Sequence, residues 1–369
     1  MTVVGTRPEI IRLSRVIALL DKFVNHILVH TGQNYDYELN QIFFENLELR
    51  KPDYFMEVDT SSLGASVGDI IRKTEDVLIK EKPDALLVLG DTNSCLSAYM
   101  AKRMHIPIFH MEAGNRCFDF NVPEETNRRI IDHIADFNLV YSENARRHLI
   151  SEGLPHRRVY LTGSPMKEVL DYYMPKINKS KILNTLKLKA KHYFTVSVHR
   201  EENVDNPENL KKVLAALNHI ASEYKMPVII STHPRTKKRL LALKEINNNK
   251  NLVFHKPFGF LDYISLQKNA FCTISDSGTI SEESAILSFP AVSLRQSMER
   301  PEAQDSGSII LTGFDTKIIV DSVKISVENF KEAAKFEKPA DYCINNTSWR
   351  VLKLIIGNAK LSNIWNNIK

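Results

Sequence analysis

Residues 276–283, with the sequence Asp-Ser-Gly-Thr-Ile-Ser-Glu-Glu, decide the fold that we expect for this chain. The apolar run before them, 270–274, is typical of a buried parallel strand, whereas residues 280–287 keep helical spacing. The small residues in between would expose backbone N–H groups at the positive end of a helix, where phosphate binds well. A carboxylate one turn later could accept hydrogen bonds from a ribose. An ordinary capped helix start is the alternative interpretation.

The length and composition favour two domains and no membrane span. The 369 residues suggest two domains of ordinary size, and 43% of hydrophobic residues are enough to build their cores. No apolar run approaches the roughly 20 residues that cross a bilayer. The opening residues, Met-Thr-Val-Val-Gly, lack a basic region and resemble a first strand instead of a signal peptide. We therefore expect a protein that does not enter membranes.

The cysteines and the charge exclude further classes of protein. Four cysteines are scattered without a Cys-x-x-Cys pair, which is typical of reduced thiols in the cytoplasm and not of disulfides or a zinc site. The formal net charge of +5 is modest and would favour an anionic ligand. No block of Lys and Arg with interleaved aromatic residues suggests nucleic acid. The sequence thus indicates a cytoplasmic protein with a small anionic ligand.

Strand-like runs alternate with helical patterns in two series, which is typical of parallel sheets covered by helices. The expected strands are 2–4, 27–30, 85–89, 107–110, 137–140, 159–161, 193–198, 228–230, 252–254, 270–275 and 291–294, and the run 308–311 follows them in the second series. The expected helices are 10–20, 35–46, 64–81, 93–104, 124–135, 143–152, 165–174, 207–223, 234–246, 260–269, 280–288 and 315–328. We predict a Rossmann-like domain over 1–174, a Lys-rich linker over 175–191 and a second domain over 192–347. A C-terminal helix, 348–369, is expected to pack back on the first domain.

Polar and charged residues follow nearly every expected strand. Ligands of open α/β sheets bind beyond the carboxyl ends of the strands, so these residues form the candidate site. Each has an ordinary alternative. Asp91 could cap the next helix, and His110 and His233 could be satisfied histidines at a sheet edge. Glu124, Glu125 and Arg128 could be a solvated first turn with an ion pair worth about 0.3–0.5 kcal/mol. Because chance would scatter such residues, we favour a cleft between the domains.

The chemistry differs between the two series. The residues after the strands of the first domain include carboxylates. Those of the second domain include a helix N-terminus, His199 and Arg300, a set suited to a diphosphate. The loop after the first strand places Arg7 to meet an anion, but it lacks Gly-x-Gly-x-x-Gly, which counts against a dinucleotide site. No Asp-x-Asp pair indicates a metal-bridged diphosphate. Cationic side chains and backbone dipoles would therefore have to stabilise the phosphates.

Six motifs recur in order along nearly the whole chain. They are Gly-Thr-Arg-Pro-Glu at 5–9, Gly-Asp-Thr at 90–92, His-Met-Glu-Ala-Gly at 110–114, Pro-Glu-Glu-Thr-Asn-Arg at 123–128, the motif at 276–283 and Glu-Arg-Pro-Glu at 299–302. Together they resemble the UDP-N-acetylglucosamine 2-epimerase family. The resemblance implies two Rossmann-like domains in the glycosyltransferase-B arrangement, with the active site in the cleft between them and UDP held mainly by the C-terminal domain.

The resemblance also implies a reaction and the residues that perform it. The reaction is non-hydrolysing epimerisation at C2, by anti-elimination of UDP to a 2-acetamidoglycal and re-addition, without NAD or metal, in a homodimer. The catalytic group would be Asp91, Glu112, Glu124, Arg128 and His199. The group that binds the UDP-sugar would be Arg7, Arg12, His233, Tyr263, Ser277, Gly278, Glu283 and Arg300. Three carboxylates of the catalytic group remain candidates for the base.

Three departures from the common pattern favour one branch of the family. Arg12 stands where Lys is common, Glu201 replaces the second Arg of His-Arg-Arg-Glu, and the segment 30–37 differs from the typical Gln-His segment. With the segments 163–173 and 256–263, they resemble the branch that makes UDP-N-acetyl-L-fucosamine from UDP-2-acetamido-2,6-dideoxy-L-talose for capsule or O-antigen. The alternatives are a UDP-N-acetylglucosamine/UDP-N-acetylmannosamine epimerase, a UDP-sugar transferase of the same fold, and a non-catalytic UDP-sugar sensor.

Overall fold

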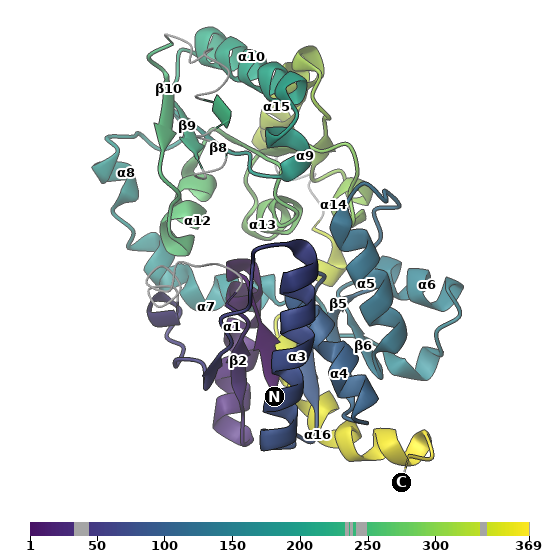
Figure 1. Ribbon diagram of the computed structural model, residues 1–369. Coiled ribbons are helices and arrows are strands. Elements are labelled where there is room, and N and C mark those ends of the chain that lie inside the picture. The colour runs from purple at the N-terminus through teal and green to yellow at the C-terminus, as the bar shows by residue number, and fades with distance from the viewer. Residues whose placement is uncertain (33–43, 233–235, 237–238, 241–248, 333–337, 369) are drawn as a thin grey trace. The chain divides into compact units, whose positions relative to one another are not determined.

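The computed structural model describes residues 1–32, 44–232, 236, 239–240, 249–332 and 338–368 (Figure 1). The chain divides into two compact units. Unit 1 consists of Met1–Asp171 and Ala340–Lys369, and unit 2 is Tyr172–Pro339. Within the described ranges, no helix is long and apolar enough to cross a membrane.

A parallel sheet forms the centre of unit 1. Its described strands are β1 (Thr2–Val4), β2 (Leu28–His30), β3 (Tyr54–Phe55), β4 (Leu86–Leu89), β5 (Ile108–Ala113), β6 (Phe137–Val140) and β7 (Val159–Leu161). They lie in the order β3-β2-β1-β4-β5-β6-β7, and every pair is parallel. Val3, Leu87 and Phe109 are buried in the central strands. A sheet buried on both faces explains why continuous apolar runs mark these strands in the sequence.

A second parallel sheet forms the centre of unit 2. Its described strands are β8 (Phe194–Ser197), β9 (Val228–Ser231), β10 (Leu252–His255), β11 (Cys272–Ser275), β12 (Ala291–Ser293) and β13 (Ile310–Leu311). The order is β10-β9-β8-β11-β12-β13, again with parallel pairs. The strand order therefore reverses between β1 and β4 in unit 1 and between β8 and β11 in unit 2. Loops diverge at such a switch point and leave room for a ligand.

Helices cover both sheets (Figure 1). In unit 1 the described helices are α1 (Arg7–Phe23), α3 (Leu63–Glu81), η1 (Asn93–Leu96), α4 (Ser97–Arg103), α5 (Pro123–Ile134), α6 (Glu143–Ser151), η2 (His156–Arg158), η4 (Ala340–Cys343) and α16 (Thr347–Trp365), and α7 (Met166–Asn178) begins there. Thr6 and Glu9 form a capping box at the start of α1, where Pro occupies the first turn. The start of α3 is capped by the hydroxyl of Ser62, which accepts from the N–H of Ala65.

The helices of unit 2 are likewise capped by side chains and packed on their sheet. Those described are α8 (Ile182–Thr185), α9 (Glu201–Val204), α10 (Pro207–Tyr224), α12 (Phe260–Asn269), α13 (Ile280–Leu287), α14 (Glu302–Asp305) and α15 (Thr316–Lys331). Asn206 and Asp315 cap α10 and α15 with their side chains. Leu217 of α10 and Val323 of α15 are buried in one cluster with Val196 of β8. The expected α/β class, with two Rossmann-like parallel sheets, is confirmed.

The C-terminal helix α16 belongs to unit 1. The hydroxyl of Thr347 donates to the carbonyl oxygen of Thr162 at 3.0 Å, and the N–H of Ser348 donates to Glu168 Oε2 at 2.8 Å. Further along, α16 lies against α1. Two side-chain contacts at the start of the helix thus fix where the returning chain joins the unit.

The segment 175–191 differs from the expected linker. It contains the end of α7 and the helix α8. Ile182 is buried with Tyr193, and Leu186 packs against the same cluster. Apolar residues among the lysines therefore anchor the segment in unit 2, and a composition-based prediction overlooked them. The expected helices 35–46 and 234–246 lie largely outside the described residues. The two-residue strand β3 and the short helices α9 and α14 were also not expected, because such pieces carry too little periodicity, whereas β13 lies within the expected run 308–311.

Candidate active site

The loops after β1 and β4 are joined by one buried carboxylate, Glu9. Its Oε2 accepts from the N–H groups of Gly5 and Thr6 at 2.5 and 2.8 Å. Its Oε1 accepts from the hydroxyls of Thr92 and Ser94, both at 2.5 Å. Burial raises the pKa of Glu9, and these donors oppose the shift. Glu9 therefore holds together the two loops that diverge at the switch point of unit 1.

Asp91, in the loop after β4, is paired with Arg128 of α5. Arg128 donates from Nε and Nη2 to Asp91 Oδ2 at 3.0 and 2.5 Å, and from Nη1 to Glu125 Oε2 at 2.8 Å. Asn127 Nδ2 donates to the carbonyl oxygen of Asp91 at 2.9 Å. The N-cap of η1 is Thr92. Asp91 is therefore held by a fork of guanidinium bonds, and the alternative that it caps the next helix is wrong.

Glu112 lies near the end of β5 in a left-handed backbone conformation, with φ of 65°. The pairing of β5 with β6 is irregular at this position. The side chain forms a buried ion pair with Arg12 of α1, and Asn115 Nδ2 lies 3.5 Å from Glu112 Oε1. A non-glycine residue in this conformation is strained, and such residues cluster at functional sites. The structure thus orients Glu112 at some cost in backbone energy.

A buried network supports the same strand. His110 Nε2 lies 2.8 Å from the carbonyl oxygen of Gly90, and His110 Nδ1 lies 2.9 Å from Asp132 Oδ1. Arg116 Nη1 donates to Asp132 Oδ2 at 2.7 Å. Burial would raise the pKa of Asp132, but His110 and Arg116 outweigh it and hold that pKa below its usual range. His110 is fully buried, so the alternative of a satisfied histidine describes it better than a role in catalysis.

In unit 2, a buried Asp276 organises the turn after β8. Its carboxylate accepts from the backbone N–H of His199 at 3.0 Å, from that of Arg200 at 2.9 Å and from Asn203 Nδ2 at 2.8 Å. His199 Nδ1 lies 3.1 Å from Asp276 Oδ1, and the imidazole is 48% exposed. Burial would raise the pKa of Asp276, but His199 and these donors hold it below its usual range. Asp276 thereby fixes the loop that presents His199.

An arginine cluster surrounds the turn before α13, with Arg200, Arg295 and Arg300 as its cations and Glu282 and Glu299 as its anions. Arg300 Nη1 donates to the carbonyl oxygen of Gly278 at 2.7 Å and lies 3.2 Å from Glu282 Oε2. Glu299 pairs with Arg295 at 2.5 Å and with Arg200 at 3.4 Å. Burial would raise the pKa of Glu299, but Arg295 and Arg200 hold it well below the usual range.

The small size of Gly278 is required by this cluster. A Cβ at this position would lie 2.8 Å from Glu299 Oε1, which is too close for any real contact. Thr279 is the N-cap of α13 and makes no capping hydrogen bond with its side chain. The hydroxyl of Ser277 accepts from the N–H of Thr279 at 3.3 Å, so a serine cap and the arginine cluster both shape the turn. Backbone N–H groups at a helix N-terminus together with cations can hold a phosphate.

The other predicted residues are distributed over both units. Tyr263 and Glu283 lie on α12 and α13; burial and the Glu283 carboxylate raise the pKa of the Tyr263 hydroxyl, and Gln267 Nε2 donates to Glu283 Oε2 at 2.8 Å. Arg7 is the first residue of α1, Glu124 lies in the first turn of α5, and both are partly exposed. His233 lies outside the described residues.

The sequence missed the residues that hold the others in place. Glu9 and Asp276 lie inside quoted motifs, yet nothing in their spacing shows that each binds donors from a second loop. Glu125 is buried and paired with Arg128 and Arg129, so the alternative of a solvated first turn does not describe it. The signal that could have found it is the amphipathic pattern of α5, which turns Glu125, Arg128 and Asp132 inward together.

Comparisons with known proteins give the family. A family model described as UDP-N-acetylglucosamine 2-epimerase matches residues 19–356. The chain belongs to that family. It is 39% identical to a UDP-N-acetylglucosamine 2-epimerase of Methanococcus maripaludis over 332 residues, which are 87% of this chain and 90% of the relative. The members are isomerases, so the expected enzyme class is confirmed, whereas the L-fucosamine branch finds no support.

Solved structures of family members agree with the fold. The structure titled UDP-N-acetylglucosamine 2-epimerase from Rickettsia bellii is 50% identical, with a TM-score of 0.91, and the match covers 98% of this chain and 97% of that one. The Methanocaldococcus jannaschii UDP-GlcNAc 2-epimerase, solved with UDP-GlcNAc and UDP, is 33% identical, with a TM-score of 0.90 and coverage of 97% and 99%. The family assignment therefore holds for both units.

Replacing Asp276 with Asn should lower the free energy of unfolding at pH 7 by about 1–3 kcal/mol, because buried donors lose a charged acceptor. The folded pKa of Asp276 is lowered, so its contribution is present above the unfolded pKa of about 3.9 and is lost as pH falls through the folded pKa. The difference between wild type and variant should shrink accordingly in urea titrations at falling pH. Asp321→Asn, on the exposed face of α15, is the control. A pH-independent difference would contradict the role of the carboxylate.

Proposed function

We propose that the protein interconverts UDP-N-acetylglucosamine and UDP-N-acetylmannosamine by epimerisation at C2. Membership of the UDP-N-acetylglucosamine 2-epimerase family is the observation that carries this proposal. The Rickettsia bellii structure, half of whose aligned residues are identical to this chain, bears the same name. This is the alternative that the sequence analysis ranked behind the L-talose sugar, and the named relatives favour it.

The arginine cluster supports a role for unit 2 in holding UDP. Arg300 is anchored on the carbonyl oxygen of Gly278, directly before α13, so its charge lies beside the helix N-terminus. We assign the diphosphate to Gly278, Ser277 and Arg300, with His199 on the neighbouring loop and Glu283 and Tyr263 toward the nucleoside. Cations and N–H groups placed in advance stabilise the charge that develops on the leaving diphosphate. Arg7 of unit 1 is assigned to the same anion.

The carboxylates of unit 1 supply the proton transfers. The C2 proton is not next to a carbonyl, so departure of UDP must lead: the C1–O bond breaks with its electrons on UDP, and a carboxylate removes the proton from C2. The product is a 2-acetamidoglycal with a C1–C2 double bond. Return of the UDP oxygen to C1, with a proton delivered to the opposite face of C2, completes the epimerisation. General acid–base catalysis of this kind needs carboxylates that differ in protonation.

The buried pairs give each carboxylate a role. Glu112 beside Arg12 is stabilised as the anion, which suits the base. Asp91, held by both Nε and Nη2 of Arg128, and Glu124 on the first turn of α5 are assigned to the second face of C2. Arg12 and Arg128 thereby hold Glu112 and Asp91 in place, and Asp91 or Glu124 would deliver the proton to the opposite face of C2 from its protonated form.

A second candidate substrate is UDP-2-acetamido-2,6-dideoxy-L-talose, which would give UDP-N-acetyl-L-fucosamine. Arg12, at a position where Lys is common, contacts the carboxylate that we assign as base, so a change here alters the environment of the reacting centre. Glu201 and the segment 30–37 are the other departures, and residues 33–37 lie outside the described ranges. A homodimer in the cytoplasm, with neither NAD nor metal, also remains part of the proposal.

One experiment tests these functions. The protein is incubated with UDP-N-acetylglucosamine or with the L-talose sugar in D2O containing EDTA, and the C2 proton is followed by NMR. Deuterium at C2 of UDP-N-acetylglucosamine, with formation of the manno epimer and traces of UDP, supports the first proposal. Exchange in the L-talose sugar alone would replace it with the second. Turnover that needs an added acceptor and leaves C2 unexchanged would instead indicate a transferase.

Glu9→Gln should slow this exchange by about tenfold to 100-fold while UDP still binds. The amide would turn an N–H group toward donors that now meet a carboxylate oxygen, so the loops after β1 and β4 would shift, and a misplacement of about 1 Å can cost 100-fold. Glu9 is a positioning residue, and the split between an impaired rate and intact UDP affinity distinguishes this role from general unfolding. An unchanged rate would show that the loops keep their places without it.

A further inference from the structure

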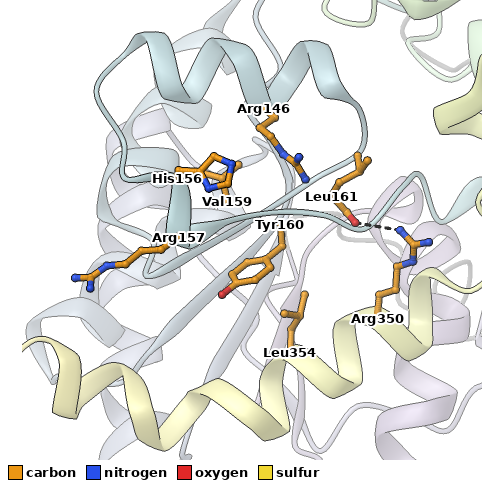
Figure 2. Close-up of a pocket in the computed structure, with 8 residues that line it drawn as sticks. All are labelled: Arg146, His156, Arg157, Val159, Tyr160, Leu161, Arg350 and Leu354. Carbon is orange, nitrogen blue, oxygen red and sulfur yellow. Dashed lines mark hydrogen bonds between the residues drawn. The ribbon is translucent and has the colours of Figure 1, made fainter.

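A hollow of about 520 Å³ in unit 1 is lined by basic side chains (Figure 2). It lies along the outer side of β7, the edge strand of the sheet, between α6, η2 and α16. The basic residues that line it are Arg146, His156, Arg157 and Arg350. None of its lining residues belongs to the candidate active site. The hollow is therefore a separate feature of the molecule.

The charge of the hollow is one-sided. Its lining combines three arginines and a histidine with Val159, Tyr160, Leu161 and Leu354, and contains no carboxylate within the described residues. Glu143, at the start of α6, lies 3.0 Å from Arg146 and offsets part of this charge. Asp341, whose Oδ2 accepts from the N–H of Glu143, also interacts with the charge of Arg146. Arg157 and Arg350 have no such carboxylate among the described lining residues, so an anion entering the hollow would be attracted.

Arg350 is held in place before any ligand arrives. Its Nη1 donates to the carbonyl oxygen of Leu161 at 3.1 Å, and its Nε donates to Asn346 Oδ1 at 2.9 Å. Figure 2 shows this side chain reaching from α16 to the end of β7. A guanidinium whose orientation is already fixed loses little side-chain entropy on binding. The Arg350 guanidinium is therefore preorganised to bind a phosphate or a carboxylate.

Arg146 extends from α6 toward Leu161 (Figure 2). Its Nε is buried and makes no hydrogen bond within the part of the chain that the structure describes. A buried donor without an acceptor is unfavourable, and an incoming acceptor could satisfy it after rearrangement of the guanidinium. Arg157, by contrast, points away from the other side chains drawn in Figure 2.

The apolar part of the lining indicates which organic group the bound anion would have. In Figure 2 the ring of Tyr160 and the side chain of Leu354 lie below Arg146 and to the left of Arg350, on one side of the two arginines. A flat group can pack on such a surface while its anionic end meets the guanidinium groups. We propose that this hollow binds a phosphate monoester with a planar organic group, between Arg146 and Arg350 and over Tyr160.

The test uses the full chain saturated with UDP, so that the candidate active site is blocked. Phenyl phosphate, UMP and inorganic phosphate are titrated separately and followed by phosphorus NMR. The two esters should bind saturably and more tightly than inorganic phosphate. Arg350→Gln and Arg146→Gln should each weaken ester binding by about tenfold, as expected for a charge-assisted contact. Arg147→Gln, on the next, exposed residue of α6, should change nothing.

The outcomes decide the proposal. Tighter binding of UMP than of phenyl phosphate would identify a nucleotide as the ligand, whereas equal binding would mean that the aryl phosphate suffices. Absence of saturable binding to the wild type would overturn the proposal. It would also fail if inorganic phosphate bound as tightly as the esters, or if all three variants behaved alike. Arg146→Gln keeps the bond between Arg350 and Leu161, so it remains informative if Arg350→Gln unfolds.

Discussion

Replacing Glu112 with Gln should lower the rate of deuterium incorporation at C2 by about 10²–10⁴-fold, the range typical of a lost general base. The carboxylate is paired with Arg12, which stabilises its ionised form, and the positive φ of Glu112 fixes the direction of its side chain. The amide is nearly the same size but cannot accept the C2 proton. The effect should therefore lie in kcat and not in the binding of the nucleotide.

Calorimetry with UDP separates chemistry from binding in this variant. The affinity for UDP should stay within about twofold of the wild type, because Glu112 is not among the residues assigned to UDP, which are Arg7 and residues of unit 2. Glu75→Gln, on the exposed face of α3, is the matched control and should change neither rate nor affinity. Intact exchange in Glu112→Gln would remove Glu112 from the mechanism and leave Asp91 or Glu124 as the base.

Replacing Arg300 with Ala should weaken UDP binding by about 10–100-fold. A charge-assisted hydrogen bond contributes about 1.5–3 kcal/mol, and Arg300 is placed by the carbonyl oxygen of Gly278 beside the N-terminus of α13. The exchange rate at saturating substrate should fall as well, because the same charge stabilises the leaving diphosphate. Isothermal titration of UDP measures the first effect, and the NMR assay measures the second.

Loss of Arg300 also leaves Glu282 buried without this cation, so the fold must be monitored. Arg300→Lys keeps the charge but not the planar fork, and should bind UDP with intermediate affinity. Lys331→Ala, an exposed cation on α15, is the control for a mere change in net charge. An unchanged UDP affinity in a folded Arg300→Ala protein would place the diphosphate elsewhere.

Elements with long periodic patterns were predictable from the sequence. The predicted strand 137–140 and helix 207–223 agree with β6 and α10 to within a residue. The spacing of the apolar residues in each segment fits only one type of secondary structure. The segment 175–191 was misjudged, since its lysines outnumber the few apolar residues that anchor it beside Tyr193. Composition describes a whole segment, whereas burial is decided by single side chains such as Ile182.

The candidate site was predictable only in part. Asp91, Glu112 and Arg300 stand out because they follow strands in the sequence, where open sheets bind ligands. Arg12 and Arg128 were named as site residues as well, but their pairings were not predictable, because Arg12 meets Glu112 across 100 residues and Arg128 meets Asp91 across 37. The alternative that places Glu125 in a solvated turn is wrong, because this residue is fully buried. Hydrogen bonds between distant loops leave no periodic trace in the chain.

By itself, the sequence determined the α/β class, the two parallel sheets and the positions of the polar residues that follow the strands. These follow from the local alternation of apolar and polar residues, which needs no knowledge of distant contacts. Only the tertiary structure decided that Glu9 joins two loops, that Asp276 holds the turn of His199 and that Glu299 leaves no room for a side chain at residue 278. The physical reason is that a buried charge must find its partners in space, and strand order, not sequence separation, determines which partners are near.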